Sequence, residues 1–364
     1  MQSLKTILIQ NKNNVTSFTS PAIITPLDRI FLKNRYISLK NFKKFANNII
    51  SSKVNLTLFE CLTLIYLKSI KNIKKIDYHL IEAGCGFNKD STNLFEMPRA
   101  QIITNLNVQH KKLLKAKNIN DICKIKCGAL SKKTTIYIGK QKPETLKIIK
   151  KILKKNPSKI FYYGRDFNIK KINNSYIYTD KKGKLKLKNI KIYSSGLIEN
   201  LAIAIKVARD FKINNRTILK AVTKIKLLGR LQFIKKGNLR KFLFKKEDLL
   251  LDGCHSEEGI LNHKKFIKNI NKPKYAIWSL QKNRDPEKYV RHLKCFKKIV
   301  AIKIPEEPNS CSAIQLKRIA KNNGIECVTA TNITSGIKTL SSKEPKILSI
   351  IGSLYTAGKV LNLN

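Results

Sequence analysis

The sequence lacks the features that mark membrane-spanning, secreted or disordered proteins. Its 364 residues contain no apolar run that approaches the ~18 residues of a transmembrane helix. The first residues do not show the charged-then-apolar pattern of a secretory signal peptide. Hydrophobic residues make up 42% of the chain, which is enough to build full cores in two domains. We therefore expect a globular cytoplasmic protein with no membrane partner.

The chain also lacks a cysteine framework. Its eight cysteines are scattered, and the closest pair, Cys123 and Cys127, is spaced for one face of a helix and not for a zinc site. We interpret the cysteines as thiols, mostly buried, in a reducing compartment.

Acidic residues are scarce, with 23 Asp and Glu against 74 Lys and Arg, so the net charge is +51. Such a polycation gains affinity for phosphate backbones by releasing counterions. However, only 11 of the basic residues are arginine, the lysines are spread along the whole chain, and no helix-turn-helix, RRM, KH or zinc-finger pattern occurs. We predict no specific nucleic-acid partner, but expect non-specific polyanion binding at low salt and attraction of polyanionic ligands.

Apolar strand-like runs alternate with amphipathic helix-like runs, which predicts parallel α/β layers. In the first part we expect strands at 14–18, 78–82, 100–105, 134–138 and 159–163, a β-rich piece at 175–179 and 184–193 with its turn at 180–183, and helices at 4–10, 197–211 and 215–224. In the last part we expect strands at 248–251, 275–279, 299–304, 325–329 and 346–351, and helices at 257–270, 286–296, 312–322 and 335–340.

Residues 225–246 are basic and interrupted by glycines, and we place the domain boundary there. The expected organisation is a first domain over 1–228, a connector over 229–246 and a small Rossmann-like domain over 247–364.

The segment that reads Leu-Asp-Gly-Cys-His at 251–255 is the clearest candidate site. An apolar run ends there at Asp252 and Gly253, as expected for a strand that presents polar side chains at the carboxyl edge of a sheet. Open α/β sheets bind their ligands at this edge.

With Gly229-Arg230 before it and Gly352-Ser353-Leu354-Tyr355 after it, this segment resembles the folylpolyglutamate synthase/dihydrofolate synthase family, ATP-dependent ligases related to the Mur ligases. Further collinear motifs extend the resemblance over nearly the whole chain: Thr19-Ser20-Pro21, Asp28-Arg29-Ile30, Thr57-Leu58-Phe59-Glu60, Glu82-Ala83-Gly84-Cys85-Gly86, Ile103-Thr104-Asn105, Tyr163-Gly164-Arg165-Asp166-Phe167 and Gly196-x-x-Glu199-Asn200. The resemblance implies an α/β, Mur-ligase-like fold, with a P-loop-type central domain and a smaller Rossmann-like carboxyl-terminal domain.

A phosphate loop of the pattern Gly-x-x-x-x-Gly-Lys-Ser/Thr is missing from the printed sequence. In the family this loop lies just before the helix that leads into the Thr-Ser-Pro element, and residues 4–10 are expected to form that helix. We interpret the chain as a family member without its amino-terminal strand and loop. A misplaced start and a true gene truncation would both give this, and either predicts impaired or absent ligase activity.

The resemblance makes Glu82 and His110 the magnesium ligands of the first domain. A carboxylate at a strand end suits a hard cation that prefers oxygen ligands, although Glu82 could instead cap the next helix. Lys126, in Lys126-x-Gly128, matches the lysine that is carbamylated in this family, and Lys126 and His110 are the expected catalytic residues.

The resemblance also implies that ATP is contacted by Asn200, Arg230, Asp252 and His255. Arginine suits phosphate because its planar fork donates two parallel hydrogen bonds. As alternatives, Asp252 could cap the following helix, and His255 could be a partly buried residue without a ligand.

The reaction implied is phosphorylation of a folate or dihydropteroate carboxylate by ATP, followed by attack of the L-glutamate amine on the acyl phosphate. We expect small-molecule substrates and a monomer. Several departures from the family pattern weaken the catalytic prediction, namely Ala22, Phe87, Asn88, Gln109 and Ile125. Two alternatives stay open: a Mur-type ligase acting on a peptidoglycan precursor, and a non-catalytic remnant that binds ligand or polyanion.

Overall fold

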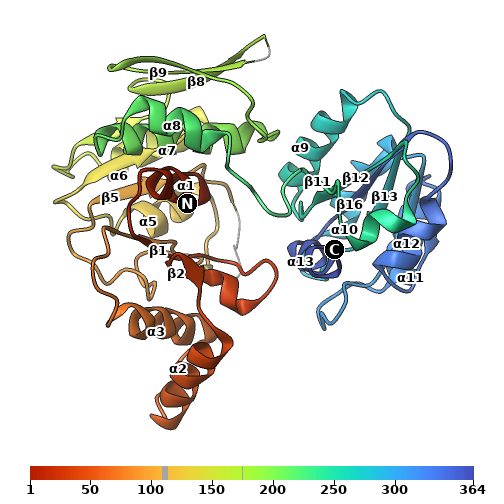
Figure 1. The fold of residues 1–364 in the computed structure, drawn as a ribbon, viewed down its shortest axis with the longest axis horizontal. Coiled ribbons are helices and arrows are strands. Elements are labelled where there is room, and N and C mark those ends of the chain that lie inside the picture. Colours follow the sequence, from red (N-terminus) through yellow and green to blue (C-terminus); the bar gives the residue numbers. More distant parts are fainter. Residues whose placement is uncertain (109–113, 174) are drawn as a thin grey trace. The chain divides into compact units, whose positions relative to one another are not determined.

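The computed structural model describes residues 1–108, 114–173 and 175–364, and the chain divides into two compact units (Figure 1). Unit 1 comprises Met1–Ala22, Leu27–Lys191 and Gly196–Lys226, and unit 2 comprises Ile23–Pro26, Ile192–Ser195 and Leu227–Asn364. Both units are mixed α/β structures, as expected for the fold class. The division falls after Lys226, so the whole segment expected as a connector, 229–246, belongs to unit 2.

The first sheet of unit 1 has the strand order β3-β2-β1-β4, in which β1 pairs in parallel with β4 and antiparallel with β2. Helix α3 packs against this sheet, since Leu62, Ile65 and Tyr66 share a core with Phe18 and Ile30. The elements are α1 (Gln2–Gln10), β1 (Val15–Phe18), β2 (Ile30–Lys33), β3 (Arg35–Tyr36), α2 (Leu39–Ser51), α3 (Leu58–Ile70) and β4 (Tyr78–Ile81). The short 3-10 helix η1 (Pro26–Arg29) precedes β2.

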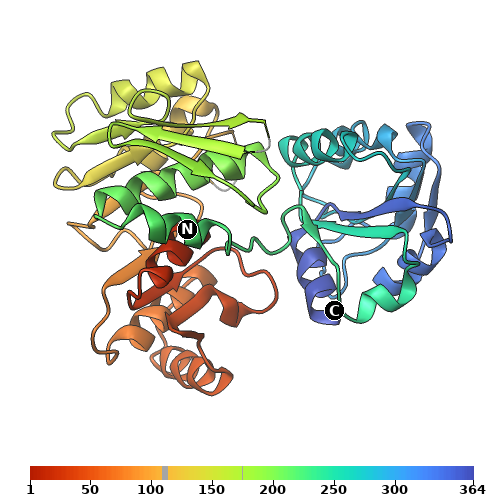
Figure 2. The ribbon, with the colours of Figure 1, turned by 45° about the horizontal axis from the view of Figure 1, so that its top comes forward.

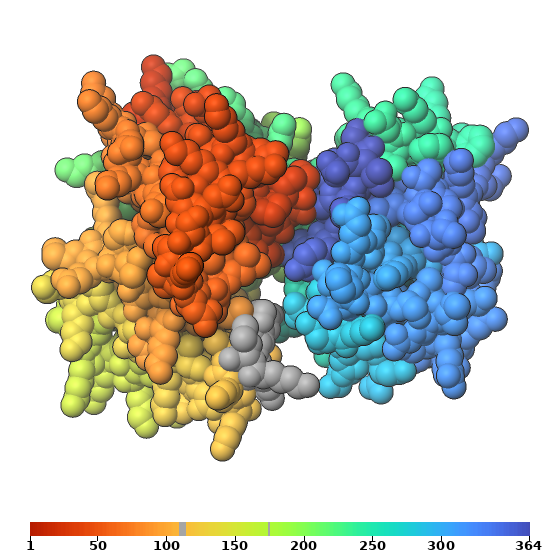
Figure 3. Space-filling view, turned by 90° about the horizontal axis from the view of Figure 1, so that it is seen from below, coloured from red at the N-terminus to blue at the C-terminus, as the bar shows by residue number. Residues whose placement is uncertain are grey.

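The Thr57-Leu58-Phe59-Glu60 motif has a local structural role. The Thr57 side chain accepts from the Glu60 N–H, and the Glu60 carboxylate accepts from the Thr57 N–H. This capping box satisfies two of the free donors at the start of α3. Helix α2 lies at the surface of unit 1 (orange-red in Figure 3) and exposes apolar side chains such as Leu39 and Ile50.

The second sheet of unit 1 is parallel, in the order β5-β6-β7. Helices α5 and α6 contribute to its core, and Cys123 and Cys127 of α5 are both buried there. All eight cysteines are free thiols. The elements are β5 (Ala100–Ile103), α5 (Ile119–Cys127), β6 (Thr135–Ile138), α6 (Pro143–Ile152) and β7 (Ile160–Tyr162).

The third sheet of unit 1 is an antiparallel meander, β10-β9-β8. Its β9–β10 hairpin lies where the sequence predicted it, whereas β8 was missed. Apolar and polar residues alternate along β8 only as far as Lys170, because Lys171 is a second polar residue in a row. The strand is held by its pairing with β9. The elements are β8 (Phe167–Ile172), β9 (Ser175–Asp180), β10 (Gly183–Leu187), α7 (Ser195–Asp210) and α8 (Asn215–Val222).

Unit 2 contains a six-stranded sheet in the order β11-β12-β16-β13-β14-β15, parallel except for the β11–β12 pair. Alternate strand residues enter two cores on opposite faces: Leu250 and Trp278 pack with α9 and α11, and Leu249 and Ile277 pack with α12 and α13. Helices lie on both sides of this sheet (Figure 2). The strands are β11 (Gln232–Phe233), β12 (Glu247–Asp252), β13 (Lys274–Trp278), β14 (Lys298–Ala301), β15 (Cys327–Thr329) and β16 (Lys346–Ile351). The helices are α9 (Glu257–Lys268), α10 (Pro286–Val290), α11 (Ala313–Asn322), α12 (Ile333–Leu340) and α13 (Leu354–Leu363).

Two details of unit 2 differ from the sequence prediction. The helix expected over 286–296 is divided into α10 and the 3-10 helix η3 (Leu293–Cys295). The expected connector contains β11, whose Gln232 pairs with Leu251, and the 3-10 helix η2 (Asn238–Phe242). Among the described helices, none combines the length and the apolar composition that crossing a membrane requires.

Lys5 of α1 gives unit 1 a predictable response to alkaline pH. Its side chain is buried over the Phe31 ring, with Nζ 4.4 Å from the ring centroid, and burial lowers the pKa of Lys5 to about 8 against the opposing effect of Asp28. Since the folded pKa lies below the ordinary 10.5, the unfolded chain binds more protons between these values. Stability should therefore rise as the pH increases through this window, and Lys5→Met should remove the rise. Denaturant titrations of both proteins at pH 7.5 and pH 10 provide the measurement, and an equal rise in both would contradict the prediction.

Candidate functional site

The first candidate site surrounds the loop that follows β4. The Glu82 N–H donates to the Phe18 carbonyl at 2.9 Å, and the Glu82 Oε2 accepts from the Ser20 N–H at 3.1 Å. Burial raises the pKa of Glu82, while the Ser20 N–H and Arg29 act in the opposite direction. The alternative that Glu82 caps the next helix is wrong, because the described segment 83–99 contains no helix. The carboxylate instead fixes the Thr-Ser-Pro segment to the end of β4.

Asp90 and Lys126 hold this loop from two sides. The Asp90 Oδ2 accepts from the Gly84 N–H at 2.9 Å, and the Lys126 Nζ donates to the Cys85 carbonyl at 2.6 Å. A side chain at Gly84 would have its Cβ 2.9 Å from the Asp90 Oδ2, so Asp90 would have to shift and its hydrogen bond to the Gly84 N–H would be disturbed. Burial lowers the pKa of Lys126, and Cys85 and Asp90 oppose this effect. The structure thus brings Lys126 to the loop that starts at Glu82.

His110, the other expected residue of this site, lies outside the described residues. The sequence did not assign a role to Asp90, although its Asp-Ser-Thr context is typical of a side chain that caps its own turn. Its Oδ1 accepts from both the backbone N–H and the hydroxyl of Thr92, at 3.0 and 2.6 Å.

Asn200, the expected nucleotide residue of unit 1, lies half-buried in the early part of α7. Its neighbour Glu199 forms an ion pair with Lys140, with 2.7 Å between Nζ and Oε1. Asn200 therefore lies next to a carboxylate that Lys140 holds in place on the same turn of α7.

The second candidate site lies at the carboxyl end of β12 in unit 2. The Gly253 N–H donates to the Gly229 carbonyl at 2.8 Å, which attaches the Gly229-Arg230 turn to the end of the strand. The backbone at Gly229 has φ +62°, in the left-handed region that favours glycine. Arg230 is near enough to the Cys254 thiol to oppose the increase in pKa that burial causes there. The structure therefore brings Arg230 to the Asp252–His255 segment.

Asp252 is buried, with 5% of its surface exposed, and its Oδ2 lies 3.0 Å from the Nδ1 of His263 on α9. The His263 Nε2 lies 3.0 Å from the Ser349 Oγ. The alternative that Asp252 caps α9 is wrong, since the Ser256 Oγ accepts from the Gly259 N–H and forms that cap. While the Oδ2 faces His263, the Oδ1 of Asp252 is the oxygen not used in that contact.

His255 is half-buried, and its Nδ1 lies 3.0 Å from the Gly253 carbonyl oxygen. His263 was missed by the sequence analysis. A signal was present, because His263 occupies the helical spacing of Ile260 and Ile267 on the buried face of α9. A histidine at an otherwise apolar helix position indicates a buried polar partner.

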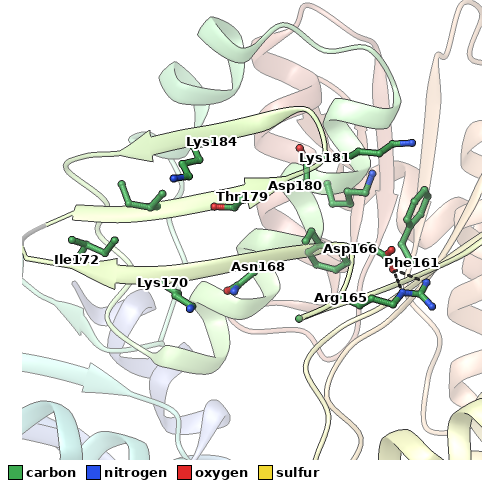
Figure 4. Close-up of a pocket in the computed structure, with 14 residues that line it drawn as sticks. Phe161, Arg165, Asp166, Asn168, Lys170, Ile172, Thr179, Asp180, Lys181 and Lys184 are labelled. Carbon is green, nitrogen blue, oxygen red and sulfur yellow. Dashed lines mark hydrogen bonds and ion pairs between the residues drawn. The ribbon is translucent and has the colours of Figure 1, made fainter.

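A hollow of about 610 Å³ lies against the antiparallel sheet β10-β9-β8 of unit 1 (Figure 4). Its lining includes Arg165 and Asp166, which form an ion pair at 2.8 Å, together with Lys170 and Lys184. None of the expected site residues among the described part of the chain lines it. We therefore do not identify the hollow with the ligand site.

No family model matches the chain. The chain is 24% identical over 379 residues to the dihydrofolate synthase/folylpolyglutamate synthase of Buchnera aphidicola subsp. Schizaphis graminum, covering 99% of this chain and 84% of that protein. It is 22% identical over 370 residues to the folylpolyglutamate synthase of Lacticaseibacillus casei, covering 94% and 82%.

Solved structures share the fold. Escherichia coli FolC in complex with DHPP and ADP matches with a TM-score of 0.85 at 18% identity, over 99% of this chain and 84% of that chain. Mycobacterium tuberculosis folylpolyglutamate synthase complexed with ADP and AMPPCP matches with a TM-score of 0.84 at 16% identity, over 100% and 87%. The chain is therefore similar over nearly its whole length to dihydrofolate synthases and folylpolyglutamate synthases, and it shares the two-domain α/β fold of the solved FolC structures.

Proposed function

We propose that the protein is an ATP-dependent ligase that joins L-glutamate to folate or dihydropteroate. The observation that carries the proposal is the collinear similarity of 99% of this chain to a dihydrofolate synthase/folylpolyglutamate synthase. In the reaction, an acceptor carboxylate oxygen attacks the γ-phosphorus of ATP and ADP leaves. The glutamate amine then attacks the acyl carbon, and phosphate and a proton are released.

For the metal we propose Glu82 and His110 as magnesium ligands. The half-buried Glu82 carboxylate fits, because a bound cation would stabilise the ionised form that burial disfavours. Magnesium is commonly held by one or two carboxylates together with water and substrate phosphates, so a single described carboxylate is compatible. When bound, the ion would neutralise charge on the phosphates. A related Yersinia pestis structure is described as complexed with AMPPNP and a manganese ion.

Lys126 is proposed to order this metal region. Its Nζ donates to the Cys85 carbonyl and thereby fixes the loop between Glu82 and Asp90. Burial also lowers the pKa of Lys126, which increases the fraction of neutral amine. The neutral amine is the form that reacts with carbon dioxide, so the site favours carbamylation.

For the nucleotide we propose contacts from Asn200, Arg230, Asp252 and His255. Arg230 follows a glycine that permits close approach, and its guanidinium can bind a phosphate with two hydrogen bonds. The net charge of +51 would raise the local concentration of polyanions such as ATP.

We further propose that the printed 364 residues alone ligate glutamate very slowly. They contain no Gly-x-x-x-x-Gly-Lys-Ser/Thr run, and a single preorganised donor at a reacting oxygen can contribute about 3–4 kcal/mol to catalysis. Phe87 and Asn88, which replace a glycine and an arginine of the family pattern, act in the same direction.

The test compares the printed chain with a variant that carries the strand and phosphate loop of the Lacticaseibacillus casei relative fused before Gln2. Each is supplied with ATP, magnesium, L-glutamate and either dihydropteroate or tetrahydrofolate, and the glutamylated product is measured by mass spectrometry. We expect product from the fused variant and none from the printed chain. Arg230→Ala should weaken ATP binding about tenfold or more, whereas Arg318→Ala, an exposed charge-matched control on α11, should not.

Rapid ligation by the printed chain would refute the proposed impairment. If neither protein binds dihydropteroate or ATP, the ligase proposal is wrong, and a non-catalytic remnant becomes the better description. Product formed only with a peptidoglycan precursor as acceptor would favour the Mur-type alternative.

A further inference from the structure

Three side chains of different chemistry converge in the interior of unit 2. Asp252 at the end of β12, Cys254 just after it and His263 on α9 each offer one ligand atom, and these atoms lie within 4.8 Å of one another. The three residues are 5%, 3% and 0% exposed. Among the described residues, these three form the group of His, Cys, Asp or Glu side chains that is close enough together to hold a metal ion.

The donor set matches the preferences of zinc. Zinc takes cysteine sulfur, histidine nitrogen and carboxylate oxygen in tetrahedral sites, at about 2.3, 2.0 and 2.0 Å. Ligand atoms in such a tetrahedron are separated by roughly 3.3–3.7 Å. The Asp252 Oδ2 and His263 Nδ1 are already 3.0 Å apart, and the trio as a whole needs to contract by about 1 Å at most.

The surrounding residues supply the supporting contacts that a metal site needs. A ligating histidine usually donates its other ring N–H to a fixed acceptor, and the Ser349 Oγ lies 3.0 Å from the His263 Nε2. The Tyr289 hydroxyl lies 3.3 Å from the Cys254 Sγ and 2.8 Å from the Cys254 carbonyl oxygen, to which it donates. Tyr289 therefore holds the cysteine through both its side chain and its backbone.

Charge balance also favours a divalent cation. A thiolate and a carboxylate carry two negative charges, which a divalent ion would neutralise inside a region that water does not reach. Burial raises the pKa of the Cys254 thiol. The nearby positive charge of Arg230 helps the thiolate form.

We propose that Asp252, Cys254 and His263 form a binding site for a thiophilic divalent cation of the zinc class, with the fourth position open. Binding breaks the S–H bond of Cys254 and releases its proton to solvent. The ring proton of His263 moves from Nδ1 to Nε2, where it is donated to the Ser349 Oγ, and two metal–ligand bonds replace the Asp252–His263 hydrogen bond. The ion would tie the end of β12 to α9 and so stabilise unit 2. The site is separate in chemistry from the proposed magnesium site at Glu82, which offers a hard oxygen ligand. It shares Asp252 with the proposed nucleotide contacts, but its argument does not rest on the proposed ligase function.

Cobalt(II) is the probe of choice, because a cobalt–thiolate bond produces a charge-transfer absorption band that oxygen and nitrogen ligands do not. The full chain is freed of metal with a chelator and titrated with cobalt(II) under reducing conditions. We expect one cobalt per chain with a thiolate band, and its displacement by zinc. Cys254→Ala and His263→Leu should each abolish the band and weaken binding at least 100-fold. Ser349→Ala should weaken binding about 10–100-fold.

Cys327→Ala and His292→Ala are the matched controls in unit 2, because they remove another buried thiol and another imidazole. Both should keep the band. If His263→Leu fails to fold, Cys254→Ala decides, and zinc should raise the melting temperature of the parent chain but not of Cys254→Ala. Cobalt binding without a thiolate band, a band that survives in Cys254→Ala, or no binding would each overturn the proposal.

Discussion

Arg209→Leu is expected to lower the free energy of unfolding of unit 1 by about 3–5 kcal/mol. Arg209 ends α7 with only 4% of its surface exposed, and it forms an ion pair with the buried Asp180 of β9. Its guanidinium also donates to the carbonyls of Gly183 and Lys182, each at 2.9 Å. Leucine would leave the Asp180 charge buried without its partner and the two turn carbonyls without donors.

Chemical denaturation followed by far-ultraviolet circular dichroism measures this change. Arg165→Ala is the matched control, since it also removes an arginine paired with an aspartate of unit 1. The Arg165 side chain is 59% exposed, so the loss of its pair should cost at most about 1 kcal/mol. Equal effects of the two substitutions would show that burial does not determine the strength of the Arg209 pair.

Gly352→Ala is expected to destabilise unit 2 by about 3 kcal/mol or more. Gly352 follows β16 with φ +103°, a conformation that residues with a side chain rarely adopt. A Cβ there would lie 1.9 Å from the Ser279 carbonyl oxygen, which is backbone and cannot rotate away. The end of β16 would have to separate from the end of β13, and α13 would lose its fixed starting point.

Trp278 is the single tryptophan of the chain and is fully buried in unit 2, so its fluorescence follows the unfolding of this unit. Gly324→Ala is the control, because Gly324 also has a positive φ, of +71°, but has no atom within 4 Å of an added Cβ. Only the backbone strain of about 1–2 kcal/mol should appear there. A loss at Gly352 no larger than at Gly324 would mean that the Ser279 contact relaxes freely.

The sequence predicted the elements of unit 2 well because its strands are short apolar runs between amphipathic helices. A strand that is buried on both faces, as β12 is at Leu249 and Leu250, appears in the sequence as a continuous apolar run. Strand β8 was missed because its partner supplies the regularity that its own residues lack.

At the candidate sites, the sequence could indicate which residues gather at a sheet edge, but not which partner each side chain takes. Asp252 was expected to contact a nucleotide, with capping a helix as the alternative, and its contact with His263 was not foreseen. This choice depends on how α9 packs against β12 and β16, which is a tertiary property. Lys126 and the loop after Glu82 were linked only by the resemblance, because nothing local connects residues 41 positions apart.

Unit 2 is assembled from three stretches of the chain, and this limits how the protein can be treated as modular. The carboxyl-terminal stretch includes Gly358, where an added Cβ would lie 1.8 Å from the Ile23 carbonyl oxygen, so α13 is built around a segment from near the amino terminus. A recombinant exchange of only residues 227–364 between relatives would therefore pack α13 of one protein against the 23–26 segment of another. A domain exchange between such relatives would have to include residues 23–26 and 192–195 together with the carboxyl-terminal part.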